Sequence, residues 1–238
     1  MKTTFFLLLL AVSFSAVAQR KHHKMDFTMP EITHGIGASF QKFDGLNSRI
    51  ANLPQYKQLP NHSGTLQLGW IKERNQFISD FNLMAGSSMS GDRDKKSSVI
   101  RYYGANANIG YDVIKSKKIL LYPSAGIGFQ KYQARFFKDV SAVNFDDVLT
   151  SPNTQNAIRS VDFKNTFLIY RLGIGFAVKP PKCPFSSIGL QAGYTGSFKD
   201  KAWRSSEDQA LQNAPVDKVS QFYVSLIMVS KPWMMMKH

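Results

Sequence analysis

The stretch YYGANANIGYDV, residues 102–113, alternates apolar side chains with small or polar ones over its whole length. One face carries Tyr103, Ala105, Ala107, Ile109, Tyr111 and Val113, and the other carries Tyr102, Gly104, Asn106, Asn108, Gly110 and Asp112. Successive side chains of a β-strand point to opposite faces, so a two-residue period indicates a strand. The stretch therefore predicts a strand with one apolar face and one small or polar face.

Seven more segments of the chain repeat this alternation. They span residues 35–43, 65–71, 77–85, 119–132, 167–178, 187–198 and 219–229. A transmembrane helix needs roughly 20 apolar residues, and no segment after the N-terminal apolar run is apolar enough. Because only helices and closed barrels pair all their backbone groups in lipid, the strands favour a barrel.

The connections between these segments are alternately long and short. The long ones are residues 44–64, 86–98, 133–166 and 199–218, and the short ones are 72–76, 114–118 and 179–186. Outer-membrane barrels have an even number of strands, with long loops outside the cell and short turns in the periplasm. The sequence therefore predicts an all-β protein, an eight-stranded antiparallel up-and-down transmembrane β-barrel in the cell outer membrane, with long loops extracellular and both termini periplasmic.

The two faces of the strands suit such a barrel. The lumen of an eight-stranded barrel is only wide enough for side chains, so we expect no open pore. Six glycines lie on the face assigned to the lumen, where they make room for larger neighbours: Gly126, Gly128, Gly173, Gly175, Gly189 and Gly193. Five outward aromatic residues are candidates for interfacial girdles: Trp70, Tyr103, Tyr111, Tyr170 and Tyr194. The alternative is a soluble lipocalin-type barrel, with its apolar face turned inward around a ligand.

The N-terminus has the features of an export signal. Residues 1–18 contain a basic start, a short apolar run and the small-residue sequence Ala16-Val17-Ala18, which predicts a signal peptide cleaved before Gln19. We expect residues 19–33 to form a periplasmic tail and residues 34–238 to form the barrel. The single cysteine, Cys183, excludes an internal disulfide, and the chain lacks the ligand spacing of a zinc site. We expect no metal and no cofactor.

Polar residues on the lumen face form one candidate site, a barrel-interior polar network. Its members are Asp80, Asn82, Asn106, Asn108, Asp112, Arg171 and Gln191. Because charges in so narrow a lumen should be paired, we expect Arg171 to pair with Asp80, Asp112 or both. A proton or ion path is the alternative interpretation.

The histidines do not indicate an enzyme. They are His22, His23, His34, His62 and His238, and none lies in a strand beside a serine and an acidic partner, as a hydrolase would need. A lipid-modifying enzyme is therefore the less favoured hypothesis. His22 and His23 belong to a basic tail, and Asp146 and Asp147 lack the ligand spacing of a calcium site.

Two loops carry aromatic residues that are candidates for recognition. They are Phe136, Phe137 and Phe145 in the longest loop and Trp203 in the last. Structured loops with such residues often bind partners. A lid that packs on itself over the barrel mouth explains them equally well.

The formal net charge is +14, and the excess lies mainly on the short-turn side. A periplasmic basic rim is predicted there, formed by Lys115, Lys117, Lys118, Lys179 and Lys182. These lysines are suited to anionic lipid head groups or an acidic periplasmic partner, and ordinary solubility charge is the alternative. We expect no nucleic-acid partner for an exported barrel.

Four strand motifs carry a resemblance to a known group: GIGASF (35–40), SAGIGFQKY (124–132), RLGIGFAV (171–178) and IGLQAGY (188–194). In these motifs the chain resembles the outer-membrane β-barrel proteins of the OmpA, OmpX and PorT-like group, and the signal ending AVAQR resembles those of Bacteroidota. The resemblance implies a structural or accessory role in envelope assembly or protein export. The implied partners are outer-membrane lipid, lipopolysaccharide and an envelope or secretion-complex protein. A surface adhesin or recognition barrel acting through residues 133–166 is the second hypothesis.

One departure from that group lies at the C-terminus. Many such barrels end on an aromatic residue that the insertion machinery recognises, whereas this chain ends Trp233-Met234-Met235-Met236-Lys237-His238. Either the insertion signal is internal, at residues 222–229 with Trp233, or the terminus has another task.

Overall fold

The computed structural model describes residues 30–92, 95–116, 118–179 and 185–230. The predicted signal peptide, most of the predicted tail, Cys183 and the C-terminal residues 231–238 lie outside these ranges.

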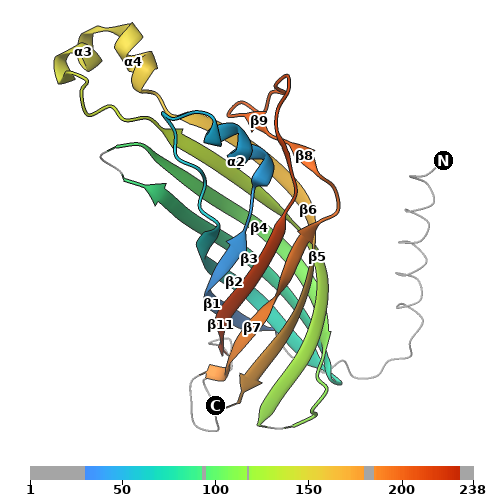
Figure 1. Ribbon diagram of the computed structural model, residues 1–238. Coiled ribbons are helices and arrows are strands. Elements are labelled where there is room, and N and C mark those ends of the chain that lie inside the picture. Colours follow the sequence, from blue (N-terminus) through green and yellow to red (C-terminus); the bar gives the residue numbers. More distant parts are fainter. Residues whose placement is uncertain (1–29, 93–94, 117, 180–184, 231–238) are drawn as a thin grey trace.

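Eight long strands of the described chain form a closed antiparallel barrel (Figure 1). They are β1 (Glu31–Gln41), β2 (His62–Arg74), β3 (Phe77–Gly91), β4 (Ser97–Tyr111), β5 (Ile119–Phe137), β6 (Val161–Val178), β7 (Phe185–Ser197) and β11 (Ser220–Ser230). Each strand pairs with its sequence neighbours, and β1 pairs with β11 to close the ring. The predicted fold class is confirmed. The strand β1 begins at Glu31, so residues 31–33, which we assigned to the tail, belong to the barrel.

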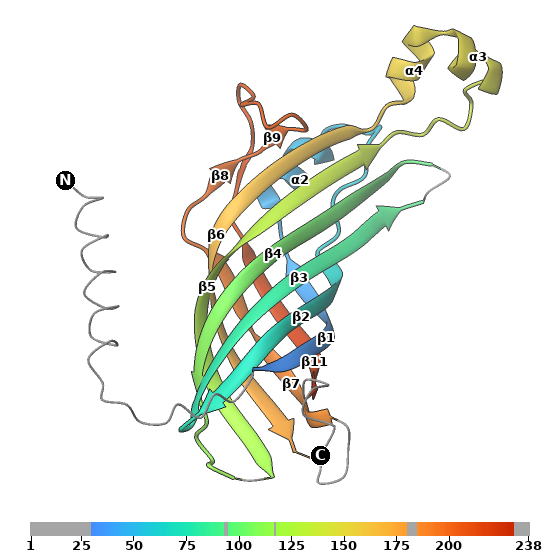
Figure 2. The same cartoon turned by 180° about the vertical axis from the view of Figure 1, so that it is seen from behind.

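The wall of the barrel is taller on one side (Figure 2). The strands β5 and β6 have 19 and 18 residues, whereas β1 and β11 have 11 each. The prediction of a long loop at 86–98 is therefore wrong, because β3 and β4 continue and leave only residues 92–96 between them. The loop predicted at 133–166 shrinks to 138–160 for the same reason. Beyond the apolar belt the outward face of these strands is mainly polar, so the alternation that predicts the strands does not reach their ends.

The tight connection between β2 and β3 shows why the short-turn end is compact. Its two residues, Asn75 and Gln76, have φ angles of 51° and 72°. Two successive left-handed residues make a hairpin turn whose twist matches that of the flanking strands. The chain therefore reverses at this point without a loop.

The apolar faces of the strands point outward and the polar faces point inward. Outward residues such as Leu66, Ile109 and Phe222 are 63%, 68% and 63% exposed, while the buried lumen residues include Asn82, Asn106 and Gln191. This orientation excludes the soluble lipocalin-type barrel, because a continuous apolar exterior requires lipid or another apolar cover.

Aromatic residues gather at two heights on the exterior. Towards the short turns, Trp70 stacks on Phe81 at 5.9 Å and Phe77 contacts Tyr111 edge-on at 5.3 Å. Towards the long loops, four rings from β6, β7, β11 and the residue that follows β7 contact one another: Tyr170, Tyr194, Phe198 and Phe222. Four of the five predicted outward aromatic residues, all except Tyr103, thus lie in two girdles of the kind that marks the lipid interfaces.

Short elements occupy the long loops. The helix α2 (Asp44–Ala51) follows β1, the helices α3 (Phe145–Thr150) and α4 (Pro152–Ile158) join β5 to β6, and the short strands β8 (Lys201–Ala202), β9 (Arg204–Ser205) and β10 (Val216–Asp217) precede β11. Within the described residues, no helix has the length and apolar character needed to cross a membrane.

The lumen is filled by two apolar clusters with a polar belt between them. At the long-loop end lies the mouth core, formed by Phe43, Leu46, Ile50, Leu59, Ile100, Tyr102, Tyr132, Ala134, Phe136, Phe167, Ile169, Trp203 and Val219. At the short-turn end lies a smaller core, formed by Ile71, Ile78, Leu120, Tyr122, Ala177 and Val229. Glycines provide the room: a Cβ at Gly175 would overlap the Tyr122 ring, and one at Gly173 would overlap the Tyr223 hydroxyl.

Candidate functional site

The polar belt of the lumen is organised around the carboxylate of Asp80. The side-chain amides of Asn82, at 2.8 Å, and of Asn108 both donate to its Oδ1. Asn108 also donates to Asn106 at 2.7 Å, and the Thr33 hydroxyl donates to Asn82 at 3.4 Å. Amides therefore satisfy the buried carboxylate, as burial of a charge requires.

Arg171 makes no direct ion pair with Asp80 or Asp112, although its charge acts on Asp80 from a distance. The register places four residues level with one another on successive strands: Asp80, Asn108, Gly126 and Arg171. Two strands separate Asp80 on β3 from Arg171 on β6, and the nearer Asn108 donates a hydrogen bond to Asp80. The Arg171 guanidinium instead lies over the Tyr223 ring, 3.7 Å from its centroid, and donates to Gln191 Oε1 at 3.4 Å. The ion pairs among the described residues all lie elsewhere.

Asp112 does not belong to the network either. Its carboxylate accepts hydrogen bonds from the backbone N–H groups of Ile114 at 3.2 Å and Leu121 at 3.4 Å. Asp112 therefore orders the connection between β4 and β5 at the short-turn end. The predicted set thus divides into an amide cluster at Asp80, a pair of Arg171 with Gln191, and a turn residue.

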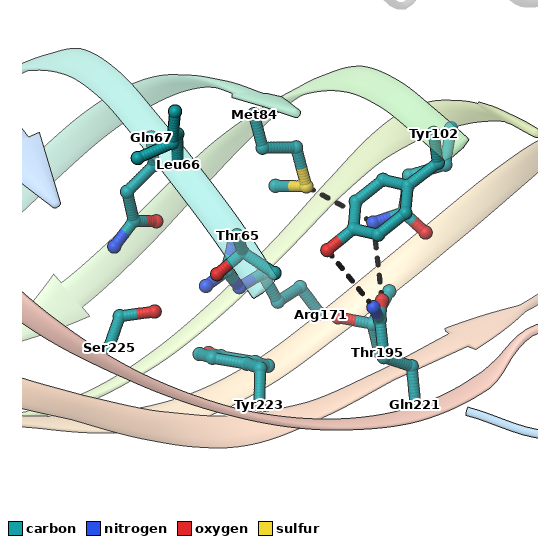
Figure 3. Close-up of a pocket in the computed structure, with 11 residues that line it drawn as sticks. Thr65, Leu66, Gln67, Met84, Tyr102, Arg171, Thr195, Gln221, Tyr223 and Ser225 are labelled. Atoms are coloured by element: carbon teal, nitrogen blue, oxygen red, sulfur yellow. Dashed lines mark hydrogen bonds between the residues drawn. The ribbon is translucent and has the colours of Figure 1, made fainter. Parts of the chain in front are cut away.

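Next to Arg171 the belt contains a cavity of about 20 Å³ (Figure 3). Three buried donors around it, Gln67 Nε2, Arg171 Nε and the Tyr223 hydroxyl, have no protein partner. A cavity of this size holds about one water molecule. It is too small for an organic ligand, and the apolar cores above and below it argue against the alternative of an ion path.

A buried carboxylate, Asp217, holds the mouth core together. Its oxygens accept hydrogen bonds from the backbone N–H groups of Gly45 at 2.7 Å and Leu46 at 2.9 Å, at the start of α2. The indole N–H of Trp203 donates to the same carboxylate at 2.7 Å. Burial raises the pKa of Asp217, and the hydrogen bond from Trp203 opposes that shift. The Asp217 side chain thus links the first long loop to the last through hydrogen bonds.

The sequence did not indicate this role of Asp217. A single aspartate in a polar loop has the pattern of a solvated residue, and its partners at positions 45, 46 and 203 are distant in the chain. An alignment of paired loop positions is the kind of signal that identifies such a contact; local composition does not.

The four predicted recognition residues have two different environments. Phe136 and Trp203 are buried in the mouth core, and Trp203 contacts Phe43 with a ring distance of 5.6 Å. For these two residues the alternative of a lid that packs on itself is the better description, because their side chains are not accessible to a partner. Phe137 is half-buried at the end of β5. Phe145 is 73% exposed.

Phe145 belongs to a segment that we call the arm, residues 138–160. Its helices project beyond the ends of β5 and β6 (Figure 1, Figure 2), and neither α3 nor α4 has a buried residue. Asn144 caps α3 through Asp146 N–H at 3.0 Å, and Ser151 caps α4 at 3.3 Å. At its base, Arg135 of β5 and Asp162 of β6 form an ion pair at 2.7 Å. The arm therefore has local structure and a fixed base.

Only some lysines of the predicted basic rim are exposed and without an ion-pair partner among the described residues. Lys115 and Lys118 are exposed, but Lys179 pairs with Glu73 at 2.8 Å. Lys117 and Lys182 lie outside the described residues.

No group of described residues has the composition of a metal site. His34 and His62 are exposed on β1 and β2, whereas His22, His23 and His238 lie outside the described ranges. Asp146 and Asp147 lie in the first turn of α3, where the helix dipole favours acidic residues.

No protein-family model matches the chain, and no curated protein matches it. Solved structures are similar to it, among them those of three outer-membrane proteins. Ail, the attachment invasion locus protein of Yersinia pestis, is 17% identical with a TM-score of 0.45, and the match covers 84% of this chain and 97% of Ail. Neisserial surface protein A is 11% identical with a TM-score of 0.43, covering 85% and 97%. A major outer membrane protein from Thermus thermophilus is 11% identical with a TM-score of 0.45, covering 83% and 99%.

These similarities concern the fold alone. The closed antiparallel ring of eight strands and its apolar exterior are themselves the features of an outer-membrane β-barrel. The finer resemblance to the PorT-like group stays a prediction.

Proposed function

We propose that this protein is a non-enzymatic outer-membrane barrel that recognises a macromolecular partner at the cell surface through the arm. One observation carries the proposal. The loops at 42–61 and 198–219 bury apolar residues in the mouth core, whereas the helices of the arm bury none and most apolar residues of the arm are exposed.

The exposed residues of the arm form a patch. Phe145, Val148 and Leu149 have the i, i+3, i+4 spacing that places side chains on one helix face, and Phe145 and Leu149 are 73% and 64% exposed. Val140 and Val143 add 41% and 38% exposed side chains just before the helix. Exposed apolar clusters on structured loops mark interaction sites.

The closed lumen also supports this proposal. With a cavity of about 20 Å³ between two apolar cores, the barrel is suited to holding external loops in place rather than to transport. In the orientation common to outer-membrane barrels, the arm faces outside the cell.

Site-specific photo-crosslinking on intact cells tests this function. A photoreactive amino acid at position 145 or 149 should give a crosslinked adduct, and adding the substitution Val148→Ser should weaken it. The same group at Leu211, which is 42% exposed in the last loop, is the matched control and should give none. Absence of adducts from the arm, or equal adducts from Leu211, would contradict recognition by the arm.

A second candidate is an accessory role in envelope assembly or protein export, as the PorT-like resemblance implies. The exposed Arg74, Lys115 and Lys118 at the short-turn end support it, because they are suited to an acidic periplasmic partner. Complementation of a deletion strain separates the two candidates. Loss of export with Lys115→Glu and Lys118→Glu but not with an arm deletion would favour the accessory role, and the reverse would favour recognition.

A further inference from the structure

The outer wall of β4, β5 and β6 changes from apolar to basic along the strands. The last apolar residues of this outer wall, towards the long loops, are Tyr103, Phe129 and Leu168, which are 55%, 47% and 59% exposed. The next outward residues towards the long loops are Arg101 on β4 and Lys131 on β5, and Lys164 follows Thr166 on the same face of β6. Three cations therefore lie just above the lipid-facing belt.

The register brings these cations together. Arg101 and Lys164 both pair with Gln133, from the two sides of β5. Lys131 is the neighbouring outward residue on β5 and pairs with Tyr103 and Thr166. Diagonal neighbours on one face of a sheet lie roughly 7–8 Å apart, so the three side chains surround Gln133 within reach of a single anionic group.

A fourth cation contacts the same wall. Lys201 of β8 is exposed and its Nζ donates to the carbonyl oxygen of Thr166 at 2.7 Å. Lys164 donates to the carbonyl oxygen of Ser206 at 2.5 Å. Each ammonium has three N–H groups, so these single bonds leave donors for a ligand.

Two of the nearby carboxylates, Asp162 and Asp208, already have partners. Asp162 accepts hydrogen bonds from Arg135 Nε and Nη2, at 2.9 and 2.7 Å, and from Gln133 Nε2 at 3.2 Å. Asp208 pairs with Arg204 at 3.7 Å. Asp200 precedes Lys201 and is exposed. Across β3 and β2, Arg101 is level with Ser87 and Gly64, which carry no charge. On the side of β3 and β2, therefore, the neighbouring positions at this level neither add to nor neutralise the charge of the three cations.

We propose that this wall binds the phosphate group of a phosphorylated glycolipid of the outer leaflet, of the lipid A class, with its acyl chains along Tyr103, Phe129 and Leu168. The proposal rests on the proposed outer-membrane location, with the long loops outside. Arginine and lysine are suited to phosphate oxygens, and the exposed apolar wall directly below accommodates the chains. A free phosphate or a soluble acidic protein would make no use of that wall.

The test uses the full chain in phosphatidylcholine nanodiscs that contain either bis-phosphorylated lipid A or its dephosphorylated form. Lipid retained per barrel is measured by mass spectrometry. The double variant Arg101→Gln, Lys131→Gln should retain roughly 10- to 30-fold less lipid A than the wild type. The matched control, Lys115→Gln with Lys118→Gln at the opposite end, should retain as much as the wild type. Faster migration of unboiled samples confirms that each variant is folded.

Three results would overturn the proposal. The first is equal retention of the dephosphorylated lipid, the second is an equal loss with the control variant, and the third is complete displacement by millimolar inorganic phosphate. A second measurement distinguishes a failure of lipid A binding from a failure of the proposed orientation, on which the proposed function depends. In a Cys183→Ser background, the Phe145→Cys variant but not the Lys115→Cys variant should react with a membrane-impermeant maleimide on intact cells. That result would uphold the orientation even if lipid A is not retained.

Discussion

The long loops of this barrel divide into two kinds that have similar composition and opposite environments. Residues 42–61 and 198–219 place Phe43, Leu46 and Trp203 inside the mouth core, with 1%, 2% and 0% exposure. The arm places Phe145 and Leu149 in the open, with 73% and 64% exposure. Apolar loop residues thus stabilise the barrel mouth in one case and remain available for a partner in the other.

The difference depends on where each loop leaves the wall. The first and last long loops are attached to the short strands β1, β7 and β11, which end closer to the middle of the barrel than the long strands do. These loops therefore fold back against the inner face of the longer strands β4, β5 and β6. The arm starts from the top of that tall side (Figure 2), where no wall faces it. The height of the strands therefore decides which loop becomes core.

The largest effect is expected from Trp203→Ala. Removing a fully buried indole from the mouth core should cost about 3–5 kcal/mol of the folding free energy of the mouth loops. Limited proteolysis should then cleave residues 42–61 and 198–219, while the heat-modifiable barrel persists. If these loops stayed resistant to protease, the mouth core would not depend on Trp203.

Asp217→Ala should have the next largest effect. It leaves the Trp203 indole N–H and the N–H groups of Gly45 and Leu46 without their acceptor, at about 1–3 kcal/mol. Faster hydrogen exchange at Gly45 and Leu46 measures the loss. Asp217→Asn keeps one acceptor oxygen and serves as the milder control; an equal effect of both substitutions would show that charge, not acceptance, matters.

A smaller effect is expected from pH. Because burial raises the pKa of Asp217 in the folded protein, the folded mouth binds a proton more tightly than the unfolded loops do. Its stability should therefore fall as pH rises from the ordinary aspartate pKa, about 4, through the raised value, and stay constant above it. Hydrogen exchange at Leu46, corrected for intrinsic rates, should show this slope in the wild type and not in Asp217→Asn.

The smallest effect on stability is expected in the arm. Phe145→Ser with Leu149→Ser removes only exposed surface, so unfolding free energy should change by less than about 0.5 kcal/mol. Urea unfolding in detergent measures this value. A loss comparable to that of Trp203→Ala would mean that the arm is packed after all, and would end the comparison between the two kinds of loop.

The two-residue periodicity of the sequence was sufficient to predict the barrel but not the side-chain contacts inside it. Alternation at Tyr103, Ala105 and Asn106 correctly predicted strand, face and lumen, because each follows from the two-residue period. The same reasoning missed the extension of β3 and β4, where Ser87 and Arg101 continue the ladder without an apolar face. It also assigned Arg171 to a carboxylate, because pairing by charge ignores the amide that lies nearer.

The sequence by itself determined the strands, their faces and the closed apolar exterior, since these depend on side-chain alternation and on the need to pair every backbone group in lipid. Only the tertiary structure decided that Trp203 is core and Phe145 is surface, that Asp217 joins two loops, and that Arg101, Lys131 and Lys164 meet on one wall. Those arrangements depend on register and strand height across distant parts of the chain, which no local pattern encodes.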